Sequence, residues 1–515
     1  MPSPADLENL FARRDAEERI RQRQQGHGKP IIGVKFQGHQ VVGVGKTLYF
    51  SNDWKTFPDF LAHYIKQKLD PDWGNAEIAK PWAERHPLLQ WYDAFCKYQQ
   101  KVIRTPGEVT VSEVVGVVSC YLGTAYALYL LDHNVELQTR LINRLKDPGQ
   151  FQGAYYELIV ASVLIRAGFD LALEDETDGA TKHCEFAAVS KKTGKRYWVE
   201  AKMRSVTGLL GRTEADGGPD GKPLKQLIPH LNKALAKPAN DERLIFIDVN
   251  TPPVFLDGRV PDWMEPAVAR LEAYEKNELP EGMTAYLFVT NVSAHRQLLE
   301  KPTSAGVPFG LGMADFNRPG YRRVSEAYRQ KLKHIDAFDI GEAFDKLDVF
   351  PTTFDGTLPS EAFGRETARV VIGQTYEFDD GIIGRVTAAT VDEQSKEMTI
   401  AVRTQDGQNA LLRHAMTDQD LAEYREVPDA YFGRITPKMK HTKDAYDLFE
   451  WLMEANQRMS REKMLNWFNK DRADRAELEA MNDLDLRIAY CEAMAAAVVH
   501  RHGFVPTDPR EKRPG

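Results

Sequence analysis

The chain has little of several features that mark particular protein classes. It holds only four cysteines in 515 residues (Cys96, Cys120, Cys184 and Cys491), and no two form a C-x-x-C pair. A zinc ribbon and a thioredoxin motif are therefore excluded, and the pattern is typical of buried thiols in a reducing cytoplasm. We find no fixed-period repeat and no low-complexity stretch, which excludes solenoids and collagen-like chains.

Long apolar runs are also scarce. The N-terminal residues carry many charges and no apolar core, so no signal peptide is expected. One uncharged stretch, 114–131, approaches the length of a membrane span. Its flanks are acidic (Glu113 and Asp132) and it contains three tyrosines. We therefore predict a buried central helix and no membrane partner.

An excess of basic residues is missing as well. The chain has 67 Lys and Arg against 75 Asp and Glu, a net charge of -8. This excludes a basic nucleic-acid coat, but an enzyme with a locally basic cleft remains possible. The composition, 42% hydrophobic and 28% charged, is that of a folded soluble protein.

The length predicts several domains of mixed α+β class. We expect a restriction-endonuclease-like αβββαβ core flanked by a helical domain, a small β-module and a C-terminal helical region. The expected segments are a charged helix and linker (1–30), a small β meander (31–55), a helical domain (56–148), the core domain (149–300), a loop-rich and helical connector (301–359), a small β-barrel-like module (360–435), a helical region (436–504) and a tail (505–515).

Segment 149–300 holds the informative pattern. Hydrophobic periodicity predicts a helix, three strands, a second helix and a fourth strand. They are expected at 151–167, 169–173, 183–189, 196–203, 224–236 and 243–249. The sequence S-K-K-T-G-K between the second and third strands predicts a tight reversal.

Three acids and one lysine fall on these elements. Glu157 lies on the first helix, Glu185 on the second strand, and Glu200 and Lys202 on the third. Alternate strand residues share a face, so Glu200 and Lys202 point the same way. The reversal can bring Glu185 beside Glu200. Carboxylates suit Mg²⁺, which takes oxygen ligands and promotes phosphodiester hydrolysis, and a nearby lysine can position water.

This segment resembles the PD-(D/E)xK nuclease superfamily over roughly 100–140 residues, a single-domain extent. The match is V-E-A-K at 199–202, with Glu157 in Y-Y-E-L at the helix position. The chain has two further acid-x-Lys triplets, at 53–55 and 220–222, but only the triplet at 200–202 lies inside an apolar strand. The chain departs from the family at the "PD" position, which reads Cys184-Glu185.

The resemblance implies a role for each residue. Glu185, Glu200 and the Ala201 carbonyl would hold Mg²⁺, for which Mn²⁺ can substitute. Lys202 would position the attacking water, and Glu157 would bind a second ion or a metal-bound water. Between residues 190 and 213 the sequence contains seven basic residues and one acidic residue, which gives a local charge of +6. Six residues are candidates for nucleic-acid binding: Lys195, Arg196, Arg204, Arg212, Lys225 and Gln226.

The predicted function is a metal-dependent endonuclease acting on DNA, in a restriction or phage-defence setting. Two alternatives stay open: a nuclease-fold subunit that binds without cutting, and an RNA-directed nuclease using the same site. Simpler interpretations also exist for single residues. Glu157 can be an ordinary helix glutamate, and Glu185 can form a cross-strand salt bridge with Lys202. The flanking domains are candidates for a homodimer contact or a partner protein.

Overall fold

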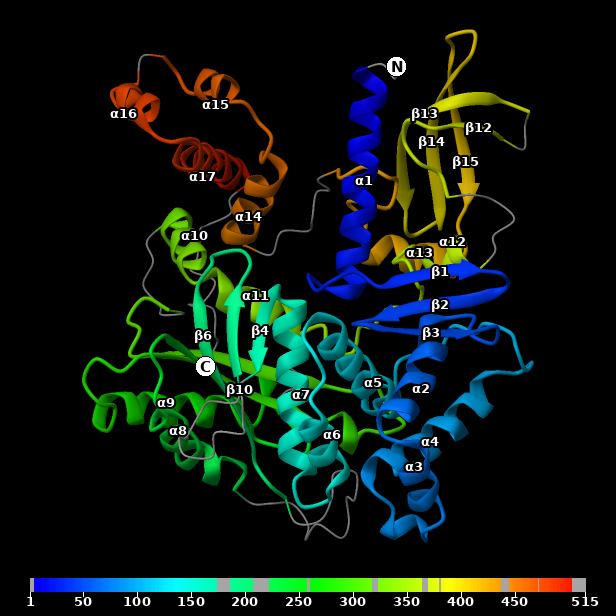
Figure 1. Ribbon diagram of the computed structural model, residues 1–515. Coiled ribbons are helices and arrows are strands. Elements are labelled where there is room, and N and C mark those ends of the chain that lie inside the picture. Colours follow the sequence, from blue (N-terminus) through cyan, green and yellow to red (C-terminus); the bar gives the residue numbers. More distant parts are fainter. Residues whose placement is uncertain are drawn as a thin grey trace. The chain divides into compact units, whose positions relative to one another are not determined.

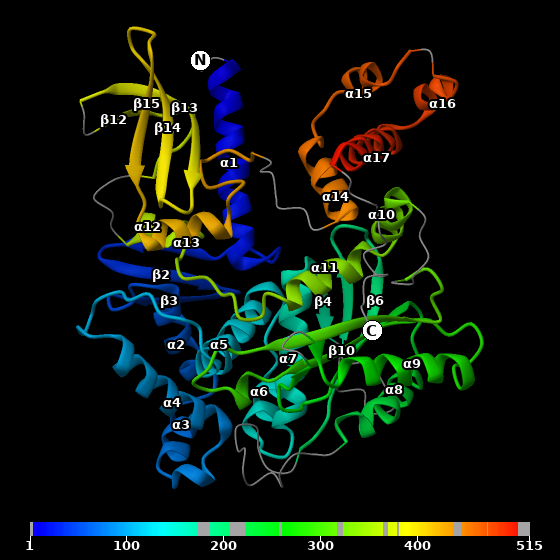
Figure 2. The same ribbon diagram turned by 180° about the vertical axis from the view of Figure 1, so that it is seen from behind.

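The computed structural model describes residues 4–173, 186–206, 222–256, 260–316, 323–363, 369–378, 381–436, 444–470 and 472–502. It is a mixed α+β protein (Figures 1 and 2). Its residues divide into two compact units. The first unit comprises Met1–Ile20, Asp315–Ile335 and Glu366–Gly515, and the second comprises Arg21–Ala314 and Asp336–Arg365. The chain therefore crosses between the units several times, and each unit combines segments that are distant in sequence.

The second unit contains the segment with the predicted site. Its helices are α2 (Phe57–Lys68), α3 (Pro71–Ile78), α4 (Pro87–Val102), α5 (Gly116–Asn134), α6 (Thr139–Lys146), α7 (Phe151–Arg166), α8 (Leu227–Leu235), α9 (Met264–Asn277), α11 (Ile335–Phe344) and α12 (Pro359–Ala362). Its strands are β1 (Ile32–Phe36), β2 (His39–Val44), β3 (Thr47–Ser51), β4 (Phe169–Leu173), β5 (Phe186–Ser190), β6 (Arg196–Met203), β7 (Glu242–Asp248), β8 (Phe255–Leu256), β9 (Val260–Pro261), β10 (Ala285–Val292) and β11 (Ser304–Leu311).

The main sheet has the strand order β11-β10-β7-β6-β5-β4. β5 is antiparallel to both β4 and β6, whereas β6, β7 and β10 run parallel to one another. α7 precedes β4, and α8 connects β6 to β7. The predicted order of helix, three strands, helix and strand is therefore present.

The two faces of this sheet are covered by different helices. Leu227 and Leu231 of α8 pack with Ile245 and Ile247 of β7 in one apolar core, which also includes α9. Both views show α8 and α9 side by side (Figures 1 and 2). Tyr156 of α7 packs against the opposite face. The two faces therefore offer separate environments to alternate residues of each strand.

The uncharged stretch 114–131 forms the buried helix that its sequence predicts. α5 is surrounded by α2, α4 and α7, and most of its side chains are buried. Its first residue, Gly116, lies so close to the chain after β10 that a Cβ there would come within 2.2 Å of the Gln297 carbonyl oxygen. No helix among the described residues is long and apolar enough to cross a membrane.

β11 is a strand that the sequence pattern does not predict. The segment contains Gly306, Pro308 and Gly310, and this composition predicts a loop. In the structure β11 is the outer strand of the sheet and pairs only with β10. An edge strand tolerates proline because one of its sides needs no backbone donor.

The first unit contains a four-stranded sheet and a helical cluster. Its elements are α10 (Val324–Lys333), β12 (Thr375–Glu377), β13 (Ile383–Asp392), β14 (Glu397–Thr404), β15 (Asn409–Ala415), α13 (Asp418–Glu426), α14 (Ala445–Ala455), α15 (Arg461–Trp467), α16 (Arg475–Ala480) and α17 (Asp483–His502). The charged helix α1 (Pro4–Gln25) starts in this unit, where Arg19 pairs with Glu454 at 3.0 Å. The β-module and the C-terminal helices thus match the expected element types.

Candidate active site

Two side chains of β6 form the centre of the candidate site. The parallel register with β7 pairs Glu200 with Ile245 and Lys202 with Ile247. Because paired residues point to the same side of a sheet, both side chains face α8. β6 has the bounds that the sequence predicts, so the alternation places these residues together as expected.

The Glu200 carboxylate lies between two lysines. Lys202 Nζ is 2.6 Å from Oε1, and Lys237 Nζ donates a hydrogen bond of 2.8 Å to Oε2. Glu200 exposes 2% of its side chain, whereas Lys202 exposes 25% and Lys237 19%. A buried carboxylate is costly unless it is paired, and the two cations supply that pairing while still reaching solvent.

The two lysines contact the carboxylate in different ways. Lys237 makes an aligned hydrogen bond, but Oε1 meets Lys202 as an ion pair and lacks a well-aligned hydrogen bond. Lys237 follows directly after α8, where its backbone N–H bonds to the Ala234 carbonyl. Sequence reasoning missed Lys237, since nothing in a helix-ending A-K-P sequence indicates a partner 37 residues earlier.

His230 of α8 is a second residue that the sequence did not indicate. Both of its ring nitrogens are buried without a hydrogen-bond partner among the described residues. Burial lowers the pKa of His230, and the nearby cations Lys233 and Lys202 lower it further. Burial and the lysine of the acid–lysine pair thus both favour the neutral form of this imidazole.

Glu157 does not join this group. Its carboxylate forms a two-pronged ion pair with Arg144 of α6, with N–O distances of 2.6 and 2.7 Å. The preceding residue, Tyr156, bonds to Thr290 Oγ1 at 2.6 Å, on the sheet face opposite Glu200. The prediction that Glu157 converges with Glu200 is therefore wrong. The helix that carries Glu157, α7, covers the sheet face opposite Glu200.

That opposite face holds its own buried carboxylate, Asp248 of β7. It accepts hydrogen bonds from the backbone N–H groups of Asn250 and Val292, both at 2.8 Å, and from Thr290 Oγ1 at 2.9 Å. Burial raises the pKa of Asp248 to about 6, and the hydrogen bonds and Arg204 oppose that rise. The hydrogen-bond donors to Asp248 among the described residues are therefore neutral groups.

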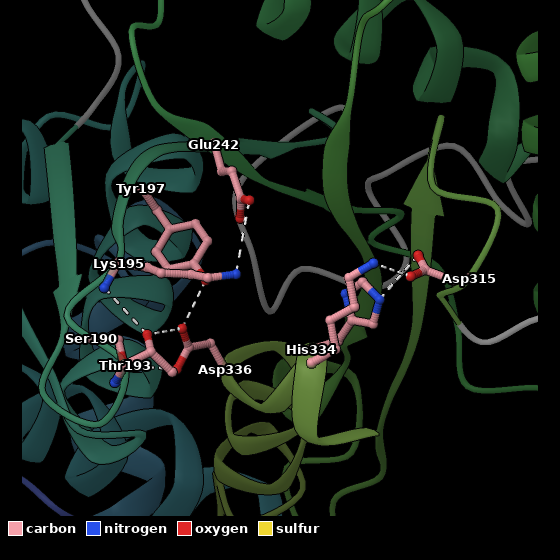
Figure 3. Close-up of polar contacts among 9 residues, drawn as sticks. Ser190, Thr193, Lys195, Tyr197, Glu242, Asp315, His334 and Asp336 are labelled. Carbon is pink, nitrogen blue, oxygen red and sulfur yellow. Dashed lines mark hydrogen bonds and ion pairs between the residues drawn. The ribbon is translucent and has the colours of Figure 1, made fainter. Parts of the chain in front are cut away.

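A third buried carboxylate fixes the reversal between β5 and β6. Asp336 of α11 accepts hydrogen bonds from Ser190 Oγ at 2.7 Å, Thr193 Oγ1 at 2.6 Å and Tyr197 Oη at 2.7 Å (Figure 3). Three hydroxyl donors on one acid lock the hairpin that precedes Glu200. Figure 3 also shows a pair of the first unit, Asp315 and His334, whose Oδ1 and Nε2 atoms are 3.2 Å apart.

The predicted nucleic-acid contacts fall into two groups. Four are exposed: Lys195 and Arg196 lie at the start of β6, 3.9 Å from Glu242 and 3.6 Å from Asp241, and Lys225 and Gln226 lie just before α8. Lys195 and Arg196 also line an open cavity of about 480 Å³. These positions leave the side chains accessible to a polyanion.

Arg204 contradicts its predicted role. It is 5% exposed, and its guanidinium donates to the carbonyls of Val249 and Asn250, both at 2.6 Å. Its charge therefore secures the turn after β7 rather than a phosphate. Glu185 and Arg212 lie outside the described residues.

The residues present fit a divalent metal in part. Glu200 is a hard oxygen donor of the kind that Mg²⁺ takes, and the Ala201 carbonyl lies next to it in sequence. Within the described ranges, no group of three or more His, Cys, Asp or Glu side chains could hold a metal ion. A complete site would thus need a ligand from outside those ranges, and Glu200 would have to exchange a lysine for the metal.

The fold and site together define an α+β protein with a buried acid–lysine pair on an internal strand of a mixed sheet. Comparison of the chain with family models, curated proteins and solved structures finds no match.

Proposed function

We propose that this protein is a metal-dependent nuclease of PD-(D/E)xK type that hydrolyses phosphodiester bonds in DNA. The observation that carries the proposal is the Glu200–Lys202 pair, with a buried carboxylate and a lysine 2.6 Å away on an internal strand. Acid and lysine side by side can combine metal binding with charge stabilisation at phosphorus.

The position of the pair in the fold supports the same proposal. It lies on the third strand of an αβββαβ sequence of elements, with the second strand antiparallel to its neighbours. Asp336 holds the hairpin before this strand rigid through three hydroxyl groups. A rigid support keeps catalytic side chains in a fixed geometry.

The proposal assigns specific roles to this chain's residues. Glu200, the Ala201 carbonyl and Glu185 would hold Mg²⁺ or Mn²⁺. A divalent ion there would polarise the phosphoryl oxygen and lower the pKa of a bound water. Lys202 would orient the attacking water or donate to a phosphate oxygen. Lys237 would neutralise Glu200 when no metal is bound. Glu157 has no assigned role, because Arg144 engages both its oxygens.

The test is a cleavage assay with supercoiled plasmid, linear DNA and single-stranded RNA in the presence of Mg²⁺ or Mn²⁺. Cutting should require metal, stop with EDTA, and be lost in Lys202→Ala. Lys233→Ala, which removes an exposed lysine of α8, is the matched control and should retain cutting. Cleavage that survives in Lys202→Ala would contradict the site assignment. Preference for RNA in the same assay would identify an RNA-directed nuclease.

Glu185→Asp tests the departure from the family pattern. If Glu185 stands in for the aspartate of the "PD" half-motif, the variant keeps a carboxylate and should cut as well as the native chain or better. Glu185→Ala should lose cutting. Equal activity of both variants would remove Glu185 from the site.

One observation favours a second candidate function, a nuclease-fold subunit that binds nucleic acid without cutting. Both described acids of the predicted metal set are already paired, Glu157 with Arg144 and Glu200 with two lysines. Absence of cutting under every metal condition, together with salt-sensitive binding of nucleic acid, would support this alternative. A restriction or phage-defence setting fits either form.

A further inference from the structure

The small sheet β1–β3 has two very different faces. Its inner face packs into the second unit: Val42 and Val44 expose 0% and 1%. Tyr49 meets Phe60 and Tyr64 of α2 edge to face, with ring centroids 5.9 and 5.6 Å apart. This face alone secures the sheet to the rest of the unit.

The outer face is apolar and uncovered. Five side chains on it expose between 58% and 70% of their surface: Ile32, Val34, Phe36, Leu48 and Phe50. The strand registers bring them together on one face. Gly43 of the central strand β2 is paired with Ile32 on one side and Leu48 on the other, and Val41 is paired in the same way with Val34 and Phe50. They therefore form one continuous surface, which we call the outer β1–β3 face.

Its area is large for a monomer. Five large side chains exposed to this extent present on the order of 500–600 Å², which is the upper end of the largest apolar patch on an ordinary monomeric protein. Isolated exposed apolar residues need no explanation, but a flat contiguous face of this kind indicates an interaction site.

The chemistry of the face indicates what covers it. Among the residues of the three strands, none on this face is charged: the alternation places Lys35 on the other face of β1, and His39 at the edge is the only titratable group of those strands on this face. A nucleic acid or a charged peptide would find no ion-pair partner here. An identical face is complementary, because two uncharged apolar surfaces meet without repulsion or desolvation of charge.

We propose that the outer β1–β3 face is the homodimer interface of this protein, packed against the same face of a second copy. Such a two-fold contact uses one patch on both subunits. Two patches together bury on the order of 1,000–1,200 Å², close to the lower limit for a specific interface. Two sheets packed face to face also match a common arrangement of apolar sheet surfaces. This inference does not depend on the proposed nuclease function.

The test is the mass of the full chain in solution, measured by sedimentation or light scattering between about 1 and 100 µM. The native chain should be a dimer. Phe50→Ser combined with Val34→Ser should raise the dimer dissociation constant by at least about 30-fold, the effect of losing one interface hot spot. Leu411→Ser removes a residue that is equally exposed, at 75%, on β15 and should leave the dimer unchanged.

Two readouts keep the result decisive. Thermal unfolding at the lowest protein concentration should be the same for both chains, because both residues are exposed, whereas at high concentration only the native chain should gain stability from association. Val34→Asp, which places a charge on the face, should also dissociate the dimer, whereas Leu411→Asp should not. A native chain that is monomeric throughout the range, or a dimer that persists in the double variant, would overturn the proposal.

Discussion

Glu200 and Asp248 are both buried carboxylates on neighbouring strands of one sheet, but they are held in opposite ways. Glu200 is enclosed by two lysines that reach solvent, whereas Asp248 is enclosed by two backbone N–H groups and a hydroxyl. The two acids face opposite sides of the sheet, since Glu200 pairs with Ile245, and Met203 pairs with Asp248. The same residue chemistry therefore serves two purposes.

The partners of the two carboxylates differ in whether they reach solvent. The proposed function requires one of these lysines, which reach solvent, to turn outward so that a metal ion can take its place on Glu200. Backbone donors and a buried hydroxyl have no such alternative, so Asp248 is fixed and part of the structure. A buried acid is a functional candidate when its partners are cations that reach solvent, and a structural one when they are neutral and enclosed.

The largest effect is expected from Glu200→Gln. The variant keeps the shape but removes the charge that holds a metal, so cleavage should fall at least ~10²-fold. The matched control is Glu157→Gln, which should retain cleavage because α7 covers the other face. Equal losses in both variants, measured as single-turnover rates, would show that the two acids act together after all.

The next effect concerns the pH dependence of folding at Asp248. Its folded pKa is raised from 3.8 to about 6. The folded state therefore binds a proton more tightly than the unfolded state, and this contribution to stability is present below about pH 4 and lost as pH rises through 6. Relative to Asp248→Asn, the unfolding free energy of the native chain should fall by on the order of 3 kcal/mol between pH 4 and 8.

Denaturant unfolding of both chains across that range provides the measurement. The constant part of the difference reflects the altered hydrogen bonding of asparagine, and only its slope reports on Asp248. A pH-independent difference would mean that Asp248 is ionised in the folded protein.

A smaller effect is expected at Lys237. If Lys237 competes with the metal for Glu200, then Lys237→Met should raise the affinity for Mn²⁺ about tenfold. The variant leaves the charge of the buried carboxylate less compensated, so a metal ion binds it more favourably. Lys233→Met, four residues earlier on α8, should leave the affinity unchanged. Weaker binding in Lys237→Met, measured by calorimetry, would show that Lys237 supports the metal site rather than competes for it.

The smallest effect is expected from Thr290→Val, which removes one neutral donor to Asp248 with little change in shape. The variant loses the hydrogen bonds of Thr290 Oγ1 to both Asp248 and the Tyr156 hydroxyl, but only the first depends on pH. The cost should therefore be about 1 kcal/mol larger at pH 8 than at pH 5, where Asp248 is protonated. Unfolding at the two pH values is the measurement. A cost that is larger at pH 5 would contradict the hydrogen-bond pattern around Asp248.

Local patterns predicted much of this fold. The bounds of β4 and β6 and the placement of Glu200 and Lys202 on one face follow from alternation alone. The strand β11 was missed because glycine and proline mask an edge strand. Glu157 was misplaced because helical periodicity does not say which face of a distant sheet the helix covers.

The partners of the site residues were beyond local reasoning. Lys237 contacts Glu200 because α8 packs against the sheet and brings the residues after it close to β6. The sequence alone suggests that Arg204 is a surface cation, but in the structure it donates to a carbonyl of the chain after β7. Such contacts depend on tertiary packing between residues about 40 positions apart. The sequence thus predicted the acid–lysine pair but not the groups that surround it.

The central claim is that Glu200 can exchange lysine for a divalent metal, and direct binding tests it best. Calorimetric titration of Mn²⁺ into the full chain and into Glu200→Gln requires no knowledge of the substrate. The account predicts binding to the native chain that the variant loses. Equal binding by both chains, or no binding by the native chain, would contradict it.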